Sequence, residues 1–186
     1  MAQCTPQIDG SEAVVYIASS TTTRIPTQRV WQTLLDTSTW PSWNTFCPRV
    51  TIRHQPDTSS DGTDSDTPSP ILQHGTQLTL HVRMDPSSPK ETDAHLVVTQ
   101  CDPPQANRPV GRIAWASDFS ASGTLPRMLL MAERVHEIGE VDGMTQVRNW
   151  EVQKGYLAYV VSWMYGQRLQ DAFNGWVSEL KGFVEG

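Results

Sequence analysis

Residues 156–186 place the strongest constraint on the fold, because they contain no proline and repeat apolar residues at helical spacing. This spacing predicts one amphipathic helix of about seven or eight turns. A helix of this kind has to bury its apolar side against another element. The apolar positions are 157, 160, 161, 164, 165, 169, 172, 173, 176, 180 and 183.

The chain before this helix predicts a β-sheet. Residues 75–84 alternate strictly between apolar and polar side chains, which is typical of a strand with one buried face. Asp142-Gly143 is typical of a two-residue hairpin turn between two further strands. We therefore expect an antiparallel sheet with one face exposed to water. The predicted strands are 13–18 (extending toward Arg24), 49–53, 75–84, 91–102, 111–118, 128–141 and 144–154.

Two short helices are predicted after the first strand. Residues 27–36 repeat apolar side chains at helical spacing, and Trp31 is expected in the core. Residues 39–44 follow, with a proline that is tolerated in a first helical turn. Trp40 and Trp43 in this second helix would either line a cavity or hold the helix against the sheet.

Residues 55–70 are rich in Ser, Thr, Asp, Gly and Pro, with almost no apolar side chain. Such a segment cannot bury enough surface to offset its loss of conformational entropy. We predict a mobile insertion at about 55–70 in a single domain that spans residues 1–186, since a long surface loop costs little in closure entropy.

The charge and the termini of the sequence exclude several classes of partner. The net charge is −6 and the lysines and arginines are scattered, so there is no electrostatic case for nucleic acid or an anionic membrane. The N-terminus lacks the basic start and apolar core of a signal peptide. No stretch approaches the roughly 20 apolar residues of a membrane span. We therefore expect a cytoplasmic protein.

The cysteines and histidines do not predict a metal site or a disulfide framework. Cys4, Cys47 and Cys101 are odd in number and widely spaced, so we expect small buried or half-buried thiols. The five histidines show no ligand spacing of a known metal motif. We expect no metal and no cofactor.

The order of elements resembles the START/Bet v 1-like SRPBCC superfamily, specifically its polyketide cyclase/dehydrase and lipid-transport group. Three segments carry the resemblance: IPTQRVWQTLLDTSTWPSWN, ERVHEIGEVDGMTQVRNWEV and GYLAYVVSWMYGQRLQDAFNGWVSELKGFV. The first holds Pro26, Val30-Trp31 and Asp36, followed by a Trp-x-x-Trp-Asn segment. Apart from the 55–70 insertion, the resemblance covers nearly the whole chain.

This resemblance implies an α+β helix-grip fold. In that fold a curved antiparallel sheet of about seven strands wraps around a long C-terminal helix, and two short helices follow the first strand. It also implies an internal cavity for a lipid, a hormone or a polyketide. The superfamily has no universal catalytic motif, so the fold by itself does not assign a reaction.

Ionisable residues concentrate on the last two predicted strands. One phase of the first of these strands holds Arg134 and His136, and the other holds Glu133 and Glu137; the sequence does not decide which phase faces the cavity. An ionisable group in an apolar cavity has a shifted pKa and can act as a general acid or base. The predicted catalytic residues are Glu133, His136 and Arg148. The alternative is a solvated face with cross-strand ion pairs such as Glu133–Arg148.

The residues predicted to bind the ligand are apolar or aromatic side chains on the second short helix, the strands and the long helix. They are Trp40, Trp43, Leu78, Leu80, Val82, Leu96, Val98, Met131, Tyr159, Trp163, Met164, Phe173 and Trp176.

Two functions fit this sequence. The first is a cofactor-free enzyme that cyclises, dehydrates or isomerises a hydrophobic polyketide-, lipid- or aromatic-type molecule by general acid–base chemistry. The second is a carrier or sensor that binds such a molecule without converting it. An ionisable group that faces the cavity without an ion-pair partner would favour the enzyme. A protein-interaction module fits less well, because no large apolar surface is evident. The chain is expected to be a monomer or a homodimer.

Overall fold

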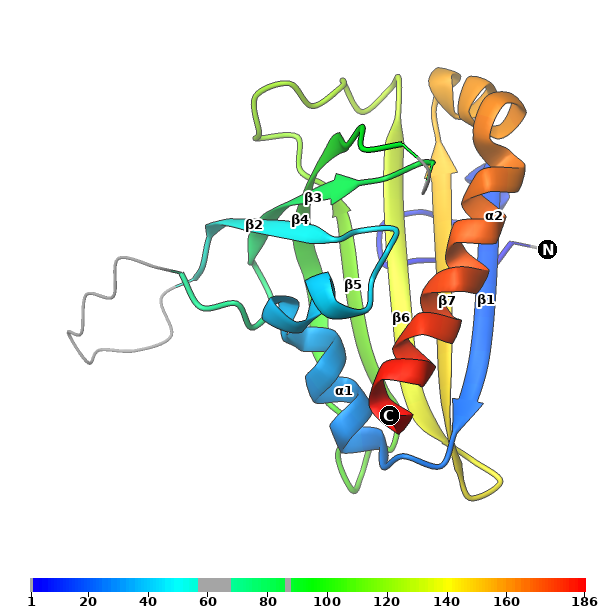
Figure 1. Cartoon of the computed structure of the whole chain (residues 1–186). Coiled ribbons are helices and arrows are strands. Elements are labelled where there is room, and N and C mark those ends of the chain that lie inside the picture. Colours follow the sequence, from blue (N-terminus) through cyan, green and yellow to red (C-terminus); the bar gives the residue numbers. More distant parts are fainter. Residues whose placement is uncertain (1, 57–67, 86–87) are drawn as a thin grey trace.

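The computed structural model describes residues 2–56, 68–85 and 88–186. Its dominant helix is α2 (Tyr156–Glu185), which lies across one face of a curved sheet (Figure 1). A single residue, Gly155, separates the helix from the last strand, and its backbone has a φ of 106°. A side chain there would collide with the carbonyl of Leu129, so a glycine is required for the chain to turn from the sheet into the helix.

The sheet has seven strands, and each neighbouring pair is antiparallel. Its spatial order is β1-β7-β6-β5-β4-β3-β2, so the first strand pairs with the last and every other strand pairs with its neighbour in the sequence. The predicted α+β helix-grip fold is confirmed. The strands are β1 (Val15–Thr23), β2 (Arg49–His54), β3 (Gln77–Val82), β4 (Thr92–Asp102), β5 (Gly111–Ser117), β6 (Met131–Val141) and β7 (Met144–Lys154).

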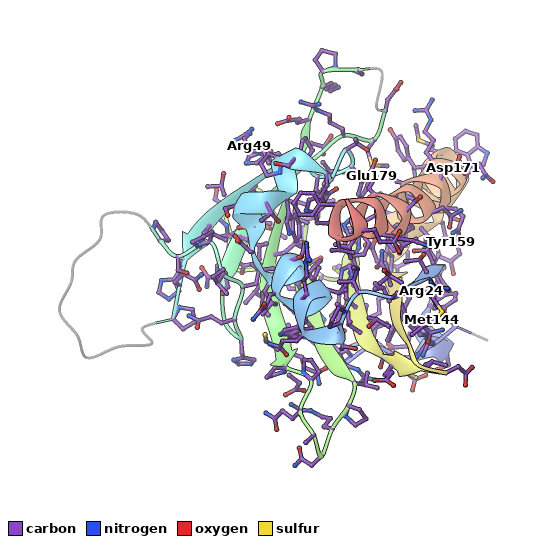
Figure 2. The ribbon with its side chains drawn as sticks, turned by 60° about the horizontal axis from the view of Figure 1, so that its bottom comes forward. Arg24, Arg49, Met144, Tyr159, Asp171 and Glu179 are labelled. Atoms are coloured by element: carbon purple, nitrogen blue, oxygen red, sulfur yellow. The ribbon has the colours of Figure 1, made fainter. Side chains whose placement is uncertain are left out.

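The two short helices are α1 (Thr27–Leu35) and the 3-10 helix η2 (Thr37–Ser42). They lie near the C-terminal end of α2 (Figure 1), and Figure 2 shows side chains filling the space between α1, α2 and the sheet there. Trp31 is buried in the core, as its helical spacing predicted. The predicted mobile segment 55–70 falls largely on residues outside the described part of the chain.

The sheet is covered on both faces. Its concave face packs on α2 and forms the main core. On the convex face a second apolar cluster forms around Met131, Val135 and Trp150. The N-terminal segment covers this cluster: Ile8 is 1% exposed within it, and the Trp150 indole donates to the carbonyl of Cys4 at 3.4 Å. Among the described residues, no helix is long and apolar enough to cross a membrane.

Candidate functional site

A pocket of about 440 Å³ lies between the concave face of the sheet and the N-terminal half of α2. This volume is within the range of small-molecule sites. The wall is mostly apolar, and it is completed by the loop that precedes β6. Its apolar side chains include Phe46, Leu80, Val82, Met84, Ala94, Leu96, Trp115, Leu125, Leu130, Val161 and Leu169.

One end of this pocket carries a buried polar group formed by Arg134, Glu151 and Gln153. The Arg134 guanidinium donates to Glu151 Oε2 through Nε at 2.9 Å, and Nη2 lies 2.8 Å from the same oxygen. Gln153 Nε2 donates to Glu151 Oε1 at 2.6 Å. The Arg134 and Glu151 side chains are only 8% and 11% exposed, so water screens this ion pair weakly. We name this group the pocket triad.

Two features leave the pocket triad able to interact with a ligand. Gln153 Oε1 is buried and has no hydrogen-bond partner among the described residues. The guanidinium lies 4.0 Å from the ring centroid of Phe173 and 5.5 Å from that of Phe46, which holds it in place through cation–π contacts. The pocket triad therefore offers a free acceptor next to a positively charged donor.

The pairing of β6 with β7 positions the pocket triad. Arg134 is directly opposite Glu151, and Ala132 is opposite Gln153. Because alternate residues of a strand point to opposite faces, these side chains share the concave face with α2. Asp93 and His95 also border the pocket, but their side chains are bonded to His81 and Thr79 in the opposite phase from Leu80 and Ala94.

Cys47 lies in the pocket wall with a thiol that stays protonated. Burial raises its pKa to about 12, with opposing smaller effects from Arg134 and Glu151. The thiolate is the nucleophilic form of cysteine, so this thiol is inert near neutral pH. Within the described ranges, no group of three or more His, Cys, Asp or Glu is placed to hold a metal ion.

On the concave face, the cross-strand pair next to Arg134 and Glu151 is His136 and Asn149. Both are fully buried, and neither ring nitrogen of His136 nor either polar atom of the Asn149 amide has a partner among the described residues. The imidazole lies between Trp115 and Trp176, with centroids 4.5 and 4.6 Å away. Burial, and secondarily the charge of Arg134, lowers the pKa of His136 well below 6.5. This histidine is therefore neutral.

The three predicted catalytic residues do not come together. His136 is on the concave face, behind the pocket wall, whereas Glu133 and Arg148 are on the convex face. Glu133 accepts from the Gln7 amide at 2.7 Å and from the Thr99 hydroxyl at 3.1 Å. The Glu133–Arg148 pair considered from the sequence does not form, because Arg148 bonds to Glu137 at 3.1 Å. A catalytic role for these residues stays a prediction, and it would need a site other than this pocket.

The predicted ligand-binding residues fall into three groups. Leu80, Val82 and Leu96 line the pocket. A second group is buried in the core and is absent from the pocket wall: Trp40, Trp43, Leu78, Val98, Phe173 and Trp176. The last group lies away from the pocket: Met131 on the convex face, and Tyr159, Trp163 and Met164 on the exposed side of α2.

The residues of the pocket triad are not among those predicted from the sequence to act on a ligand, although the sequence does contain a signal for their pairing. In a two-residue hairpin, residues equally distant from the turn are paired. Arg134 lies eight positions before Asp142 and Glu151 eight positions after Gly143, and they are opposite each other. The same rule pairs Glu133 with Val152 and Glu137 with Arg148. The position of the turn therefore fixes which residues of β6 and β7 are paired. Only the face of the sheet on which each pair lies remains to be decided.

Comparison with known proteins places the chain in a family. No family model matches it. The "Oxopyrrolidines biosynthesis cluster protein O" of Penicillium oxalicum is 45% identical over 193 residues, covering 98% of this chain and 92% of that protein.

Solved structures resemble the fold at low sequence identity. A hypothetical protein from Helicobacter pylori has a TM-score of 0.73 at 14% identity, covering 99% of this chain and 96% of its own. The Zhui aromatase/cyclase from Streptomyces sp. R1128 has a TM-score of 0.59 at 13% identity, covering 92% and 93%. Ara h 8.0201 has a TM-score of 0.54 at 11% identity, covering 92% and 97%. The chain belongs to the family of the Penicillium oxalicum protein, and it shares its fold with Ara h 8.0201 and the Zhui aromatase/cyclase.

Proposed function

We propose that this protein binds a hydrophobic, carbonyl-bearing small molecule in its pocket and converts it by proton transfer as a step of a biosynthesis. The observation that carries the proposal is the pocket triad, a buried ion pair and amide at one end of an otherwise apolar pocket. Ligand sites of this kind use apolar walls for affinity and a few polar groups for orientation.

The pocket triad suggests how the ligand is oriented. Arg134 can donate to a carbonyl oxygen, and Gln153 Oε1 can accept from an N–H or O–H group. A five-membered lactam presents these two functions side by side, because its ring holds the amide in the cis form, whereas an open-chain secondary amide is trans. The relative in an oxopyrrolidine biosynthesis cluster supports a ligand of this class. The apolar remainder of the molecule would lie along Leu80, Leu96 and Val161.

The Arg134–Glu151 pair also suits a proton transfer next to a carbonyl group. Glu151 would take a proton from the carbon beside the carbonyl, and the negative charge would appear on the oxygen that faces Arg134. One anion and one cation are then present before and after the step, so the buried site keeps its net charge. For a β-hydroxy carbonyl compound, Glu151 would return the proton to the departing hydroxide, which leaves as water.

A carrier without turnover is the second candidate, and one observation favours it. Both carboxylate oxygens of Glu151 already accept hydrogen bonds, from Arg134 and Gln153. A general base has to reach the proton that it removes, so Glu151 would first have to give up one of these hydrogen bonds. Tyr165 lines the pocket, and its phenol can donate to a ligand in either case.

The two candidates differ in the fate of a bound compound. We expect the wild type to convert the compound and Glu151→Gln to leave it unconverted, because the amide cannot accept a proton. Since this variant also removes the counter-ion of Arg134, its circular dichroism spectrum has to match that of the wild type at the assay temperature. Glu137→Gln is the matched control, since Glu137 is a buried carboxylate paired with arginine on the convex face. Chromatography of the compound after incubation with each protein is the measurement. If the wild type binds the compound without converting it, the protein is a carrier. If Glu151→Gln converts the compound as well as the wild type does, Glu151 is not the base.

A further inference from the structure

The outward side of α2 changes character after Met164. Before that point it carries exposed apolar or aromatic side chains: Tyr156 (72% exposed), Tyr159 (66%), Val160 (45%), Trp163 (86%) and Met164 (51%). From Gln167 onward the same side carries polar residues, namely Gln167, Arg168, Asp171, Asn174 and Ser178. A solvent-facing helix side is normally polar throughout, so the segment from Tyr156 to Met164 requires an explanation.

The loop before β6 extends this apolar surface. Met128 is 68% exposed and Leu125 is 43% exposed. The Tyr156 amide donates to the Met128 carbonyl at 3.3 Å, which joins the loop to the start of α2, and Figure 1 shows both at the same end of the molecule. We name this surface the apolar rim; it consists of Leu125, Met128, Tyr156, Tyr159, Val160, Trp163 and Met164.

The apolar rim borders the pocket. Leu125 belongs to both. On α2 the exposed Val160 and Met164 each precede a residue that lines the pocket, Val161 and Tyr165. A ligand that passes between the loop and α2 therefore crosses the apolar rim.

The charge around the apolar rim differs from that of the whole chain. Residues 119–132 and 154–170 contain none of the 20 acidic residues, but they contain Arg127, Lys154 and Arg168. Lys154 pairs with Glu12 at 2.8 Å; in the described part of the chain, Arg127 and Arg168 form no ion pair. Arg127 and Arg168 thus lie beside the apolar rim in a protein of net charge −6, and Asp85 and Asp171 line a second pocket together with Arg168.

Two acidic residues lie near the pocket: Asp93 is in its wall, and Glu91 is two residues before Asp93 in the sequence. Glu91 bonds to Arg49 at 2.9 Å and to Arg83 at 3.2 Å, and Asp93 lies 2.7 Å from the His81 ring. These acids therefore offset the positive charge beside the apolar rim only in part.

We propose that the apolar rim docks on the surface of a lipid membrane, so that the pocket opens toward the bilayer. Trp and Tyr side chains favour the headgroup region, and Arg127 and Arg168 flank them where lipid phosphates would lie. Methionine and valine side chains would enter the edge of the hydrocarbon. A hydrophobic ligand could then move between membrane and pocket without crossing water. A second copy of the chain fits less well, because pairing two rims would oppose like charges from Arg127 and Arg168.

Vesicle flotation tests this proposal directly. We expect the wild type to float with phosphatidylcholine vesicles and more strongly when phosphatidylserine is included. The Tyr159→Ser/Trp163→Ser variant should lose at least tenfold in its partition coefficient. Arg127→Gln/Arg168→Gln should lose mainly the increment due to phosphatidylserine. Val141→Ser is the matched control, because Val141 is 46% exposed on the β6–β7 hairpin, away from the apolar rim.

Three results would overturn the proposal. The wild type could fail to bind either vesicle, which would indicate that the apolar rim binds a protein and not a membrane. Val141→Ser could lose as much binding as the rim variant, which would mean that the attachment is non-specific. Sedimentation velocity could show a dimer that the rim variant lacks, which would assign the surface to a second copy. The proposal does not depend on turnover in the pocket, so a carrier would give the same flotation result.

Discussion

Two ion-pair clusters, each built on a buried carboxylate of β6 or β7, lie on opposite faces of the same sheet. On the concave face Arg134 pairs with Glu151 beside the pocket. On the convex face Glu137 pairs with both Arg112 and Arg148. Burial and pairing therefore do not by themselves mark a functional site.

The two clusters differ in how their cations are solvated. The Arg112 and Arg148 side chains are 42% and 43% exposed, so water solvates their charges. Arg134 is 8% exposed and depends on Glu151 for compensation. The convex cluster also binds the N-terminal segment, because Arg148 donates to Gln3 at 2.8 Å. We infer that the convex cluster has a structural role and that the concave pair is available to a ligand.

The largest predicted effect is a difference in stability between a variant of Glu151 and a variant of Glu137. Glu151→Leu should lower the free energy of unfolding by about 3–5 kcal/mol, because it leaves Arg134 buried without a counter-ion. Glu137→Leu should cost about 1 kcal/mol or less, because its arginines reach water. Urea denaturation followed by circular dichroism measures both. Arg134→Met/Glu151→Leu should recover most of the loss; equal losses in the two single variants would contradict the comparison.

A smaller effect is expected for Glu133, which lies on the convex face. Glu133→Gln should lower the free energy of unfolding by about 1–2 kcal/mol. The new glutamine side chain has one acceptor oxygen, whereas the backbone N–H of Gln7 and the hydroxyl of Thr99 each donate to a separate oxygen of Glu133. Amide hydrogen exchange of the N-terminal segment should rise, while ligand content stays unchanged. If Glu133→Gln bound the compound but no longer converted it, the catalytic role predicted from the sequence would stand.

The pH dependence of stability should report the neutral His136. Its folded pKa is lowered by burial, so below about 6.5 the unfolded chain binds a proton that the folded chain does not. Stability is therefore lost as the pH falls, by about 1.4 kcal/mol per pH unit between about 6.5 and the lowered folded pKa. His136→Phe should lack this slope in urea titrations at pH 5 and 6. Equal slopes in both proteins would contradict a buried neutral imidazole.

Most of the fold could be predicted from local patterns. Alternation and the Asp142-Gly143 turn predicted β3, β6 and β7, and the apolar spacing predicted α2. The predicted strand 128–141 begins later, at Met131, because residues 128 and 129 instead bond to the start of α2. The second short helix is a 3-10 helix. Such boundaries depend on tertiary contacts that a local pattern does not contain.

The site could be predicted only in part, because strand alternation leaves the choice of face open. Part of the convex face is also buried, because the N-terminal segment covers Met131 and Glu133; nothing in the composition of that segment predicted this cover. The apolar spacing of α2 also continued into Val160 and Met164, which are exposed. Net charge also says nothing of where charges lie: residues 119–132 and 154–170 contain no acidic residue in a chain of net charge −6.

The central claim is that the concave pocket holds a small molecule, and native mass spectrometry tests it most directly. The protein would be incubated with an organic extract of the organism that encodes it, and the adducts would be identified after release. We expect one class of carbonyl-bearing compound on the wild type and on Glu137→Gln. Ala132→Phe, which fills the pocket, should carry none, whereas Thr22→Phe on an exposed strand position should retain it. An adduct that persists in Ala132→Phe, or a wild type that captures nothing, would contradict the account.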